Sequence, residues 1–364
     1  MSALVEAKGI SKIFDVSRPW LNRVLERQPR QLLRAVDEIS FSIRRGETLA
    51  LVGESGCGKS TVARMLVGLY TPNSGSISFD GKDLVTELSS ERSAALRRRM
   101  QMIFQDPYAS LNPRWTVSQI VAEPIWVHQL MSARSDVDQR VRQLLEHVGL
   151  AGGDADKFPH QFSGGQRQRI SIARALASQP EFLVCDEPTS ALDVSVQAQV
   201  LNLMRKLQRD DGLTYLFISH NLAVVHHVSD RIGVMYLGRI VEMAPKKTLF
   251  QRPQHPYTRM LLDAIPDVKM TGRARKPVSG EVPNPLNPPS GCSFHPRCPY
   301  ADERCKSERP KVLELEGDSS TACHAIEERR VEWAANQQAA STSESPELAN
   351  RESRPSSRLA LRST

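Results

Sequence analysis

The chain has 364 residues, with 48 Lys and Arg against 41 Asp and Glu, a formal net charge of +7 at pH 7. Its mean hydropathy is −0.37, and no apolar run approaches the roughly twenty residues that span a bilayer. The N-terminus lacks the pattern of a secretory signal, so we expect a cytoplasmic protein without its own membrane path. The charge is spread along the chain and no nucleic-acid motif is present, so we expect no nucleic-acid partner. The basic surface is either simply solvated or helps docking at an anionic membrane face.

The first hundred residues predict strands and one phosphate-binding loop. Strand-like segments span residues 4–8, 36–43, 48–52 and 75–79. After the third comes the stretch GESGCGKST, residues 53–61, which fits the P-loop pattern and precedes a helix-like run. Backbone N–H groups of such a loop bind phosphates, the lysine reaches the β- and γ-phosphates, and the serine hydroxyl binds Mg²⁺. The expected nucleotide contacts are Gly53, Ser55, Gly56, Cys57, Gly58, Lys59, Ser60 and Thr61.

An insert at residues 17–34 interrupts this strand-rich region. Trp20, Leu21, Val24 and Leu25 are at helical spacing and have arginines around them. The pattern predicts a short amphipathic helix. Such a helix either packs on the surface of its own domain, which we prefer, or lies near a membrane.

Two adjacent acids follow a later apolar run. Residues 182–185 read as a buried strand, and Asp186 and Glu187 stand at its C-terminal tip. Ligands bind at that edge of an open α/β sheet. Asp186 is therefore expected to hold Mg²⁺, and Glu187 to polarise an attacking water.

The motif order makes residues 4–325 similar to the nucleotide-binding subunit of an ABC transporter. Ser163, Gly164, Gly165 and Gln166 match the family signature, which implies contact with the γ-phosphate of ATP held by the opposite subunit. The resemblance also implies a Q-loop glutamine at Gln105, which would help hold Mg²⁺, a D-loop at residues 190–193 and a switch histidine at His220. Phe14 is either the aromatic residue that stacks on adenine or a side chain that simply packs.

The resemblance implies an α/β fold of the P-loop NTPase class, a mixed sheet with an antiparallel β subdomain plus a helical subdomain. We expect the ATPase domain at residues 1–250, with the helical subdomain at 106–178. An extension spans 251–330, and 334–364 is predicted to be a disordered tail because it is poor in apolar residues. In this family a coupling helix of the permease enters the cleft beginning at Gln105, which residues 108–115 would line.

The extension contains a cluster of cysteines, Cys292, Cys298, Cys305 and Cys323. Clustered cysteines in the cytosol favour metal over disulfides, and the wide gaps suit an iron–sulfur cube better than a zinc site. We therefore predict a [4Fe–4S] cluster, with zinc and metal-free reduced thiols as alternatives. Cys57 and Cys185 are expected to be small buried side chains. The extension resembles the ATPase subunits of oligopeptide and dipeptide importers.

This resemblance implies a set of partners. We expect two permease subunits, a second ATPase subunit, and indirectly a periplasmic or extracellular solute-binding protein. A heterodimer of ATPases is favoured and a homodimer remains possible, because the chain has both a P-loop and a signature. The protein would be peripheral, on the cytoplasmic face of the inner membrane. The alternatives are import of nickel or another small solute and, from another class, a soluble ABC ATPase without a permease.

Overall fold

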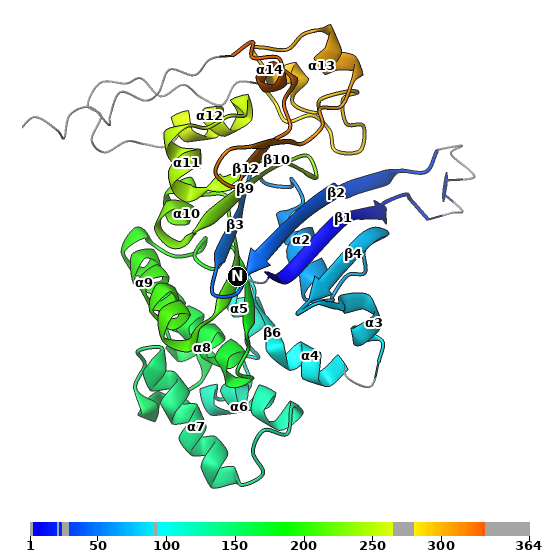
Figure 1. Cartoon of the computed structure of the whole chain (residues 1–364). Coiled ribbons are helices and arrows are strands. Elements are labelled where there is room, and N and C mark those ends of the chain that lie inside the picture. Colours follow the sequence, from blue (N-terminus) through cyan, green and yellow to red (C-terminus); the bar gives the residue numbers. More distant parts are fainter. Residues whose placement is uncertain (1–2, 20–21, 24–28, 91–92, 265–279, 332–364) are drawn as a thin grey trace, which may run out of the picture.

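The computed structural model describes residues 3–19, 22–23, 29–90, 93–264 and 280–331, and it contains two sheets (Figure 1). The smaller sheet is antiparallel with the strand order β2-β1-β4-β5. Its strands are β1 (Ala3–Asp15), β2 (Leu32–Arg44), β4 (Ser74–Phe79) and β5 (Lys82–Asp83), followed by the helices α3 (Leu84–Leu88) and α4 (Ser93–Arg99).

The β1–β2 hairpin is longer than the sequence pattern predicted. β1 continues to Asp15, where it pairs with Leu32 of β2, so residues 32–34 of the predicted insert belong to a strand. Cross-strand pairing supplies backbone partners there that a pattern along one segment cannot reveal. Trp20, Leu21, Val24 and Leu25, which carried the prediction of an amphipathic helix, lie outside the described residues, as does the tail predicted at 334–364.

The larger sheet is mixed, with the order β11-β12-β10-β9-β3-β8-β7-β6. Its strands are β3 (Thr48–Val52), β6 (Met100–Ile103), β7 (Phe182–Asp186), β8 (Thr214–Ser219), β9 (Arg231–Tyr236), β10 (Arg239–Pro245), β11 (Leu313–Leu315) and β12 (Ser319–Thr321). The five strands from β9 to β6 are parallel. In β3, Leu49 and Leu51 join one hydrophobic core while Ala50 and Val52 join the other, so the sheet separates two cores. Strands that are covered on both faces have continuous apolar sequences, which is why the sequence pattern predicted them.

Helices cover the sheet and build a separate lobe. The helices that follow strands of the large sheet are α2 (Lys59–Leu66), α9 (Val194–Asp211), α10 (Leu222–Val228) and α11 (Lys246–Gln251). The lobe contains α5 (Pro107–Ser110), α6 (Val117–Val127), α7 (Arg134–His147), two 3₁₀ turns (Gly152–Asp156 and Pro159–Gln161) and α8 (Gly164–Ala177). Figure 1 places α7 at the opposite end of the molecule from α13 and α14 of the C-terminal extension (Glu303–Ser307 and His324–Glu327).

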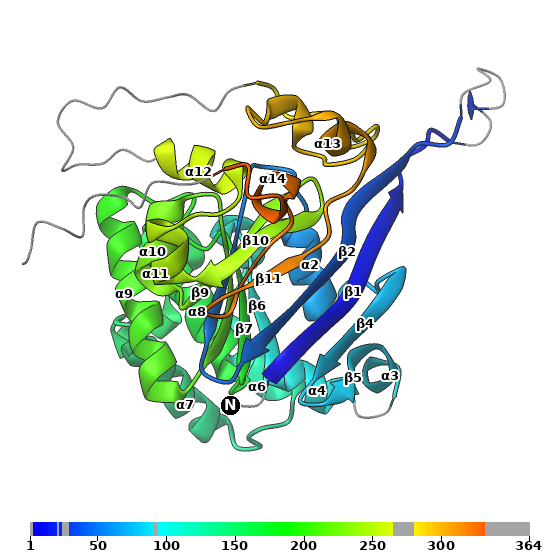
Figure 2. The same ribbon diagram turned by 45° about the horizontal axis from the view of Figure 1, so that its top comes forward.

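The extension is built onto the ATPase sheet. It begins with α12 (Pro256–Asp263) and includes a 3₁₀ turn (His295–Arg297) ahead of α13. Its strand β12 pairs antiparallel with β10, with Thr321 opposite Glu242 and Ser320 opposite Met243. In Figure 2 the orange C-terminal segment of the extension runs beside β10. The extension therefore continues the central sheet of the ATPase core at its β10 edge.

A buried histidine at the start of α12 gives a prediction about acid stability. The His255 ring is buried, its Nδ1 accepts the Tyr257 N–H (3.1 Å), and burial lowers its pKa from 6.5 to about 3. Between pH 6.5 and pH 3, His255 therefore binds a proton in the unfolded chain but not in the folded chain. Folding stability is lost as the pH falls from 6.5 towards 3. Because one proton is involved, the slope contributed is about 1.4 kcal/mol per pH unit.

We expect His255→Asn to be less acid-sensitive than the native chain, because asparagine also caps a helix and does not titrate. Denaturant unfolding at roughly pH 4.5 and pH 6 measures both slopes. Glu242, whose pKa burial raises to about 7, titrates with the opposite sign but is present in both chains. Equal slopes in the two chains would contradict the assignment.

No helix in the described part of the chain is both long and apolar enough to cross a bilayer.

Candidate functional site

The predicted phosphate loop connects β3 to α2, and two of its glycines are required by close contacts. Gly53 has φ 157° and a Cβ there would lie 2.2 Å from the Met235 carbonyl oxygen. Gly58 has φ 106° and a Cβ would lie 2.1 Å from the Ala35 carbonyl oxygen. Only glycine tolerates both constraints, so the loop can curl tightly and α2 can begin at Lys59.

Lys59 is held by the loop itself. Its Nζ donates to the carbonyl oxygens of Gly53 (2.8 Å) and Glu54 (3.0 Å) and lies 3.6 Å from Cys57 Sγ. The side chain is buried although it is a cation. A buried ammonium requires partners, and these carbonyls are partners that an incoming phosphate can replace.

Ser60 and Asp186 form an oxygen pair beside the loop. Ser60 Oγ donates to Asp186 Oδ1 at 2.9 Å. Burial raises the pKa of Asp186, the Ser60 hydrogen bond lowers it, and the neighbouring Glu187 charge raises it again. A hydroxyl and a carboxylate side by side are the hard oxygen donors that Mg²⁺ binds, so these residues fit the predicted metal.

Glu187 is the centre of a second group. Its Oε2 accepts from Gln105 Nε2 at 3.3 Å and lies 3.0 Å from His220 Nδ1. Asp186 ends β7, and Gln105 and His220 come just after β6 and β8, the two strands beside it in the sheet. Parallel strands end at one edge, which is why three residues far apart in sequence meet there. Glu187 has φ 46°, a left-handed conformation that a non-glycine residue rarely adopts.

A cavity of about 1080 Å³ joins the loop to this group. Lys59, Ser60, Gln105, Glu187 and His220 all line it. Phe14 lines it as well, with its ring 5.4 Å from the Tyr70 ring in an edge-on arrangement. The cavity therefore collects the P-loop, the Glu187 group and the aromatic candidate into one site.

Some predicted site residues are not part of the described lining of this cavity. Asp186 and Cys57 are outside the described lining, and the Cys57 side chain is buried beneath the loop, where burial raises its pKa. The signature residues are also outside the lining. Ser163 caps α8 by accepting the Gln166 N–H (3.3 Å), and a Cβ on Gly165 would lie 2.2 Å from Val196 Cγ1. The signature thus sits on the helical lobe.

The predicted iron–sulfur cluster finds no support in this geometry. All six cysteines are free thiols, but in the described part of the chain no group of three or more His, Cys, Asp or Glu side chains is placed to hold a metal ion. Separate elements orient the predicted ligands: Cys305 is in α13 and Cys323 precedes α14, while Cys292 and Cys298 lie on either side of the 3₁₀ turn. Burial raises the pKa of Cys292 to about 12 and that of Cys298 to about 11.

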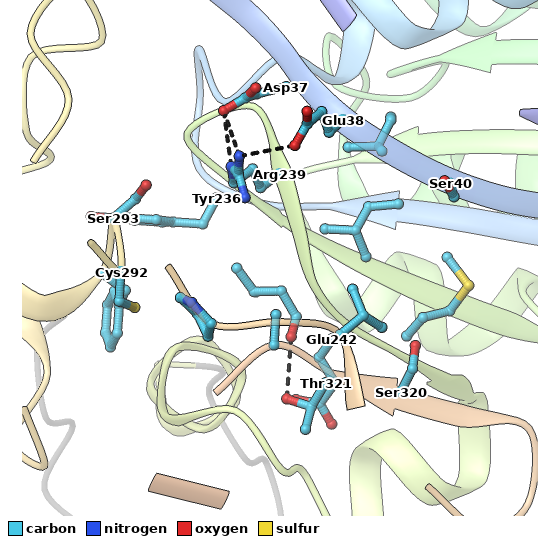
Figure 3. A pocket seen from close by; sticks show the side chains of 18 of the residues that line it. Asp37, Glu38, Ser40, Tyr236, Arg239, Glu242, Cys292, Ser293, Ser320 and Thr321 are labelled. Atoms are coloured by element: carbon cyan, nitrogen blue, oxygen red, sulfur yellow. Dashed lines mark hydrogen bonds and ion pairs between the residues drawn. The ribbon is translucent and has the colours of Figure 1, made fainter. Parts of the chain in front are cut away.

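The sequence pattern did not predict that the extension contributes residues to the lining of the P-loop cavity. Extension residues line the same cavity as the P-loop: Leu261, Pro285, Pro288, Pro289, Ser293 and Arg309. Figure 3 shows the junction from a second, smaller pocket, where Cys292 and Ser293 face Tyr236 and Arg239 of the β9–β10 hairpin. Arg239 Nε donates to Asp37 Oδ2 at 2.9 Å there. No local motif announces these contacts, since they join segments more than fifty residues apart.

Two family models match the chain. The ABC transporter family matches residues 36–190, and the family described as the oligopeptide/dipeptide transporter C-terminal region matches residues 241–305. The second match begins in β10 and includes the extension as far as Cys305 in α13.

Proteins of similar sequence are named as transport ATP-binding proteins. The oligopeptide transport ATP-binding protein AppF of Bacillus subtilis (strain 168) is 48% identical over 325 residues, which is 88% of this chain and 97% of that protein. The di/tripeptide transport ATP-binding protein DppF of Pseudomonas aeruginosa (strain UCBPP-PA14) is 48% identical over 329 residues, 90% of this chain and 99% of that protein.

Solved structures of similar fold are ABC cassettes. The dimeric post-hydrolysis state of the ATP-binding cassette MJ0796, bound to ADP and Pi, has a TM-score of 0.57 and 26% identity, covering 66% of this chain and 98% of that one. The structure of cbiO1 from Clostridium perfringens has a TM-score of 0.58 and 27% identity, covering 69% and 91%. This chain belongs to the family of ABC transporter ATP-binding proteins that carry the oligopeptide/dipeptide transporter C-terminal region, and its activity is ATP hydrolysis coupled to transport.

Proposed function

We propose that this chain drives the uptake of di- and oligopeptides through separate permease subunits by hydrolysing ATP at the P-loop cavity. The observation that carries the ATPase part is the Glu187 group, in which Gln105 and His220 contact one carboxylate beside the loop. The peptide cargo is supported by the match to the C-terminal region and by the names of AppF and DppF.

The loop residues would bind the triphosphate. On ATP binding, Lys59 would exchange the carbonyls of Gly53 and Glu54 for β- and γ-phosphate oxygens, which are stronger partners because they are charged. Ser60 and Asp186, with Gln105, would hold Mg²⁺, which supplies charge neutralisation to the phosphates. Phe14 would stack on the adenine from the wall of the same cavity.

Glu187 would be the general base. A carboxylate beside the γ-phosphate orients a water and accepts its proton, provided that the carboxylate is held within hydrogen-bonding reach. Gln105 and His220 would fix its orientation through the contacts at Oε2. The His220 side chain is 57% exposed, so its ring would be within reach of a γ-phosphate in this cavity.

A second ATPase subunit would complete the site. The signature residues from Ser163 to Gln166 lie on the helical lobe, outside the described lining of the P-loop cavity. A signature on one subunit can contact ATP on another only in a dimer, and the MJ0796 cassette is a dimer. We favour pairing with a related but different subunit, and the signature and P-loop of this chain also permit a homodimer.

The permease would dock beside Gln105. Phe104, Tyr108 and Trp115 are exposed there, at 41%, 64% and 37%, and exposed aromatics in one region mark a protein-binding surface. Arg167 of α8 stacks on the Tyr108 ring at 3.8 Å and links this surface to the signature helix. The chain would thus be peripheral to the membrane, on its cytoplasmic face, with any solute-binding protein contacting only the permease.

Uptake in cells that lack this gene tests the cargo. We expect labelled di- and oligopeptide uptake to be lost and to return with the native chain, while ⁶³Ni uptake is unchanged. Loss of nickel uptake with intact peptide uptake would overturn the peptide assignment and favour the nickel alternative. Loss of neither, with the chain purifying away from membranes, would favour a soluble ABC ATPase.

A further inference from the structure

A salt bridge ties the C-terminal extension to the phosphate loop. Arg297, which follows Pro296 in the 3₁₀ turn, donates from Nη1 to Glu54 Oε2 (2.8 Å) and from Nη2 to Glu54 Oε1 (3.0 Å). This is the bidentate arrangement that arginine forms with a carboxylate. The Arg297 side chain is 2% exposed and that of Glu54 is 22% exposed, so water screens the pair weakly.

The backbone of Glu54 is held by the extension too. Its N–H donates to Tyr257 Oη of α12 at 3.0 Å. Tyr257 is fully buried and packs against Tyr236 of β9 (4.7 Å between ring centroids) and Phe294 of the extension (5.4 Å). Phe294 lies three residues before Arg297, so one packed aromatic group positions both contacts to Glu54.

Glu54 in turn contacts the residue that binds phosphate. Its carbonyl oxygen accepts from Lys59 Nζ (3.0 Å) and from the Cys57 N–H (3.3 Å). The peptide of Glu54 is thus fixed on one side by the extension and on the other by the loop. Glu54 lines the nucleotide cavity, and its carboxylate pairs with Arg297 and accepts a hydrogen bond from Tyr257 Oη at 3.5 Å.

We propose that Arg297 is a positioning residue for nucleotide binding, which fixes the Glu54 peptide of the P-loop and neutralises the Glu54 carboxylate near the triphosphate. Without Arg297 a carboxylate would face the phosphates uncompensated, and like charges repel at short range. ATP affinity would therefore depend on docking of the extension. This inference rests on ATP binding at the P-loop as proposed above.

The test measures Mg²⁺–AMPPNP affinity by titration calorimetry, together with KM and kcat for ATP, on the full chain. We expect Arg297→Gln to weaken binding about tenfold, a typical coupling between two sites, with KM rising more than kcat falls. Arg297→Lys should give a smaller loss, because an ammonium neutralises charge but cannot form both bonds. The double variant Glu54→Gln/Arg297→Gln should regain most of the affinity, since it removes the uncompensated carboxylate.

The matched control is Arg304→Gln, an arginine of the same extension that pairs with Glu308 and Glu328 on the surface. It should bind the nucleotide as the native chain does. Native nucleotide affinity in Arg297→Gln would overturn the proposal. The proposal would also fail if the single and double variants lost affinity equally and had equally lowered melting temperatures, because Arg297 would then have only a structural role. If Arg297→Gln fails to fold, the nucleotide affinities of Arg297→Lys and of the double variant still test the proposal. Loss of binding in the native chain itself would reject the proposed ATP site instead.

Discussion

Glu187→Gln is expected to bind ATP as the native chain does and to hydrolyse it about 10²- to 10⁴-fold more slowly, the usual range for loss of a general base. Glutamine has nearly the shape of glutamate and can keep contacts with Gln105 and His220. It cannot accept a proton from water. Phosphate release at saturating MgATP, with nucleotide binding measured in parallel, separates the two steps.

The control for this change is Glu303→Gln, at a glutamate whose side chain is 89% exposed and is not part of the described cavity lining. It should hydrolyse ATP at the native rate. A native rate in Glu187→Gln would show that another group activates the water. Lost binding in that variant would instead mean that the Glu187 carboxylate holds the loop together.

Lys59→Ala is also expected to have a large effect, on both MgATP binding and hydrolysis. We expect MgATP binding to weaken by about ten- to a hundredfold, since a charge-assisted hydrogen bond contributes about 1.5–3 kcal/mol. Hydrolysis should fall below detection because both binding and charge stabilisation are lost. The carbonyls of Gly53 and Glu54 also lose their donor, so the melting temperature is measured alongside affinity.

Lys306→Ala, which removes an exposed lysine of the extension, is the comparison for that variant. It should leave affinity and rate unchanged. If Lys59→Ala bound MgATP as tightly as Lys306→Ala, Lys59 would not be a phosphate ligand.

Local patterns predicted the ATPase core well. The P-loop, the buried strand before Asp186 and the order of Gln105, Glu187 and His220 depend on residues close in sequence and on strands whose apolar runs are visible. The parallel arrangement then follows from the fold family, and it brings these residues to one edge of the sheet.

The extension was less predictable because its contacts are long-range. Nothing near Arg297 indicates a partner 243 residues earlier, and nothing near Thr321 indicates that it pairs with Glu242. The iron–sulfur prediction from the cysteine spacing finds no support for a related reason: spacing limits how far apart thiols can lie, but it does not determine whether three or more side chains are placed to hold a metal ion. Glu54 was not predicted as a site residue because it occupies a variable position of the P-loop pattern.

The claim that ATP hydrolysis at this site drives peptide uptake is tested most directly in proteoliposomes that contain the purified transporter with this chain. ATP hydrolysis and labelled-peptide uptake are measured in the same vesicles. With native Glu187, peptide should accumulate in proportion to ATP hydrolysed. With Glu187→Gln, both should disappear together. Peptide accumulation that continued after hydrolysis was lost would contradict the claim that this site drives transport.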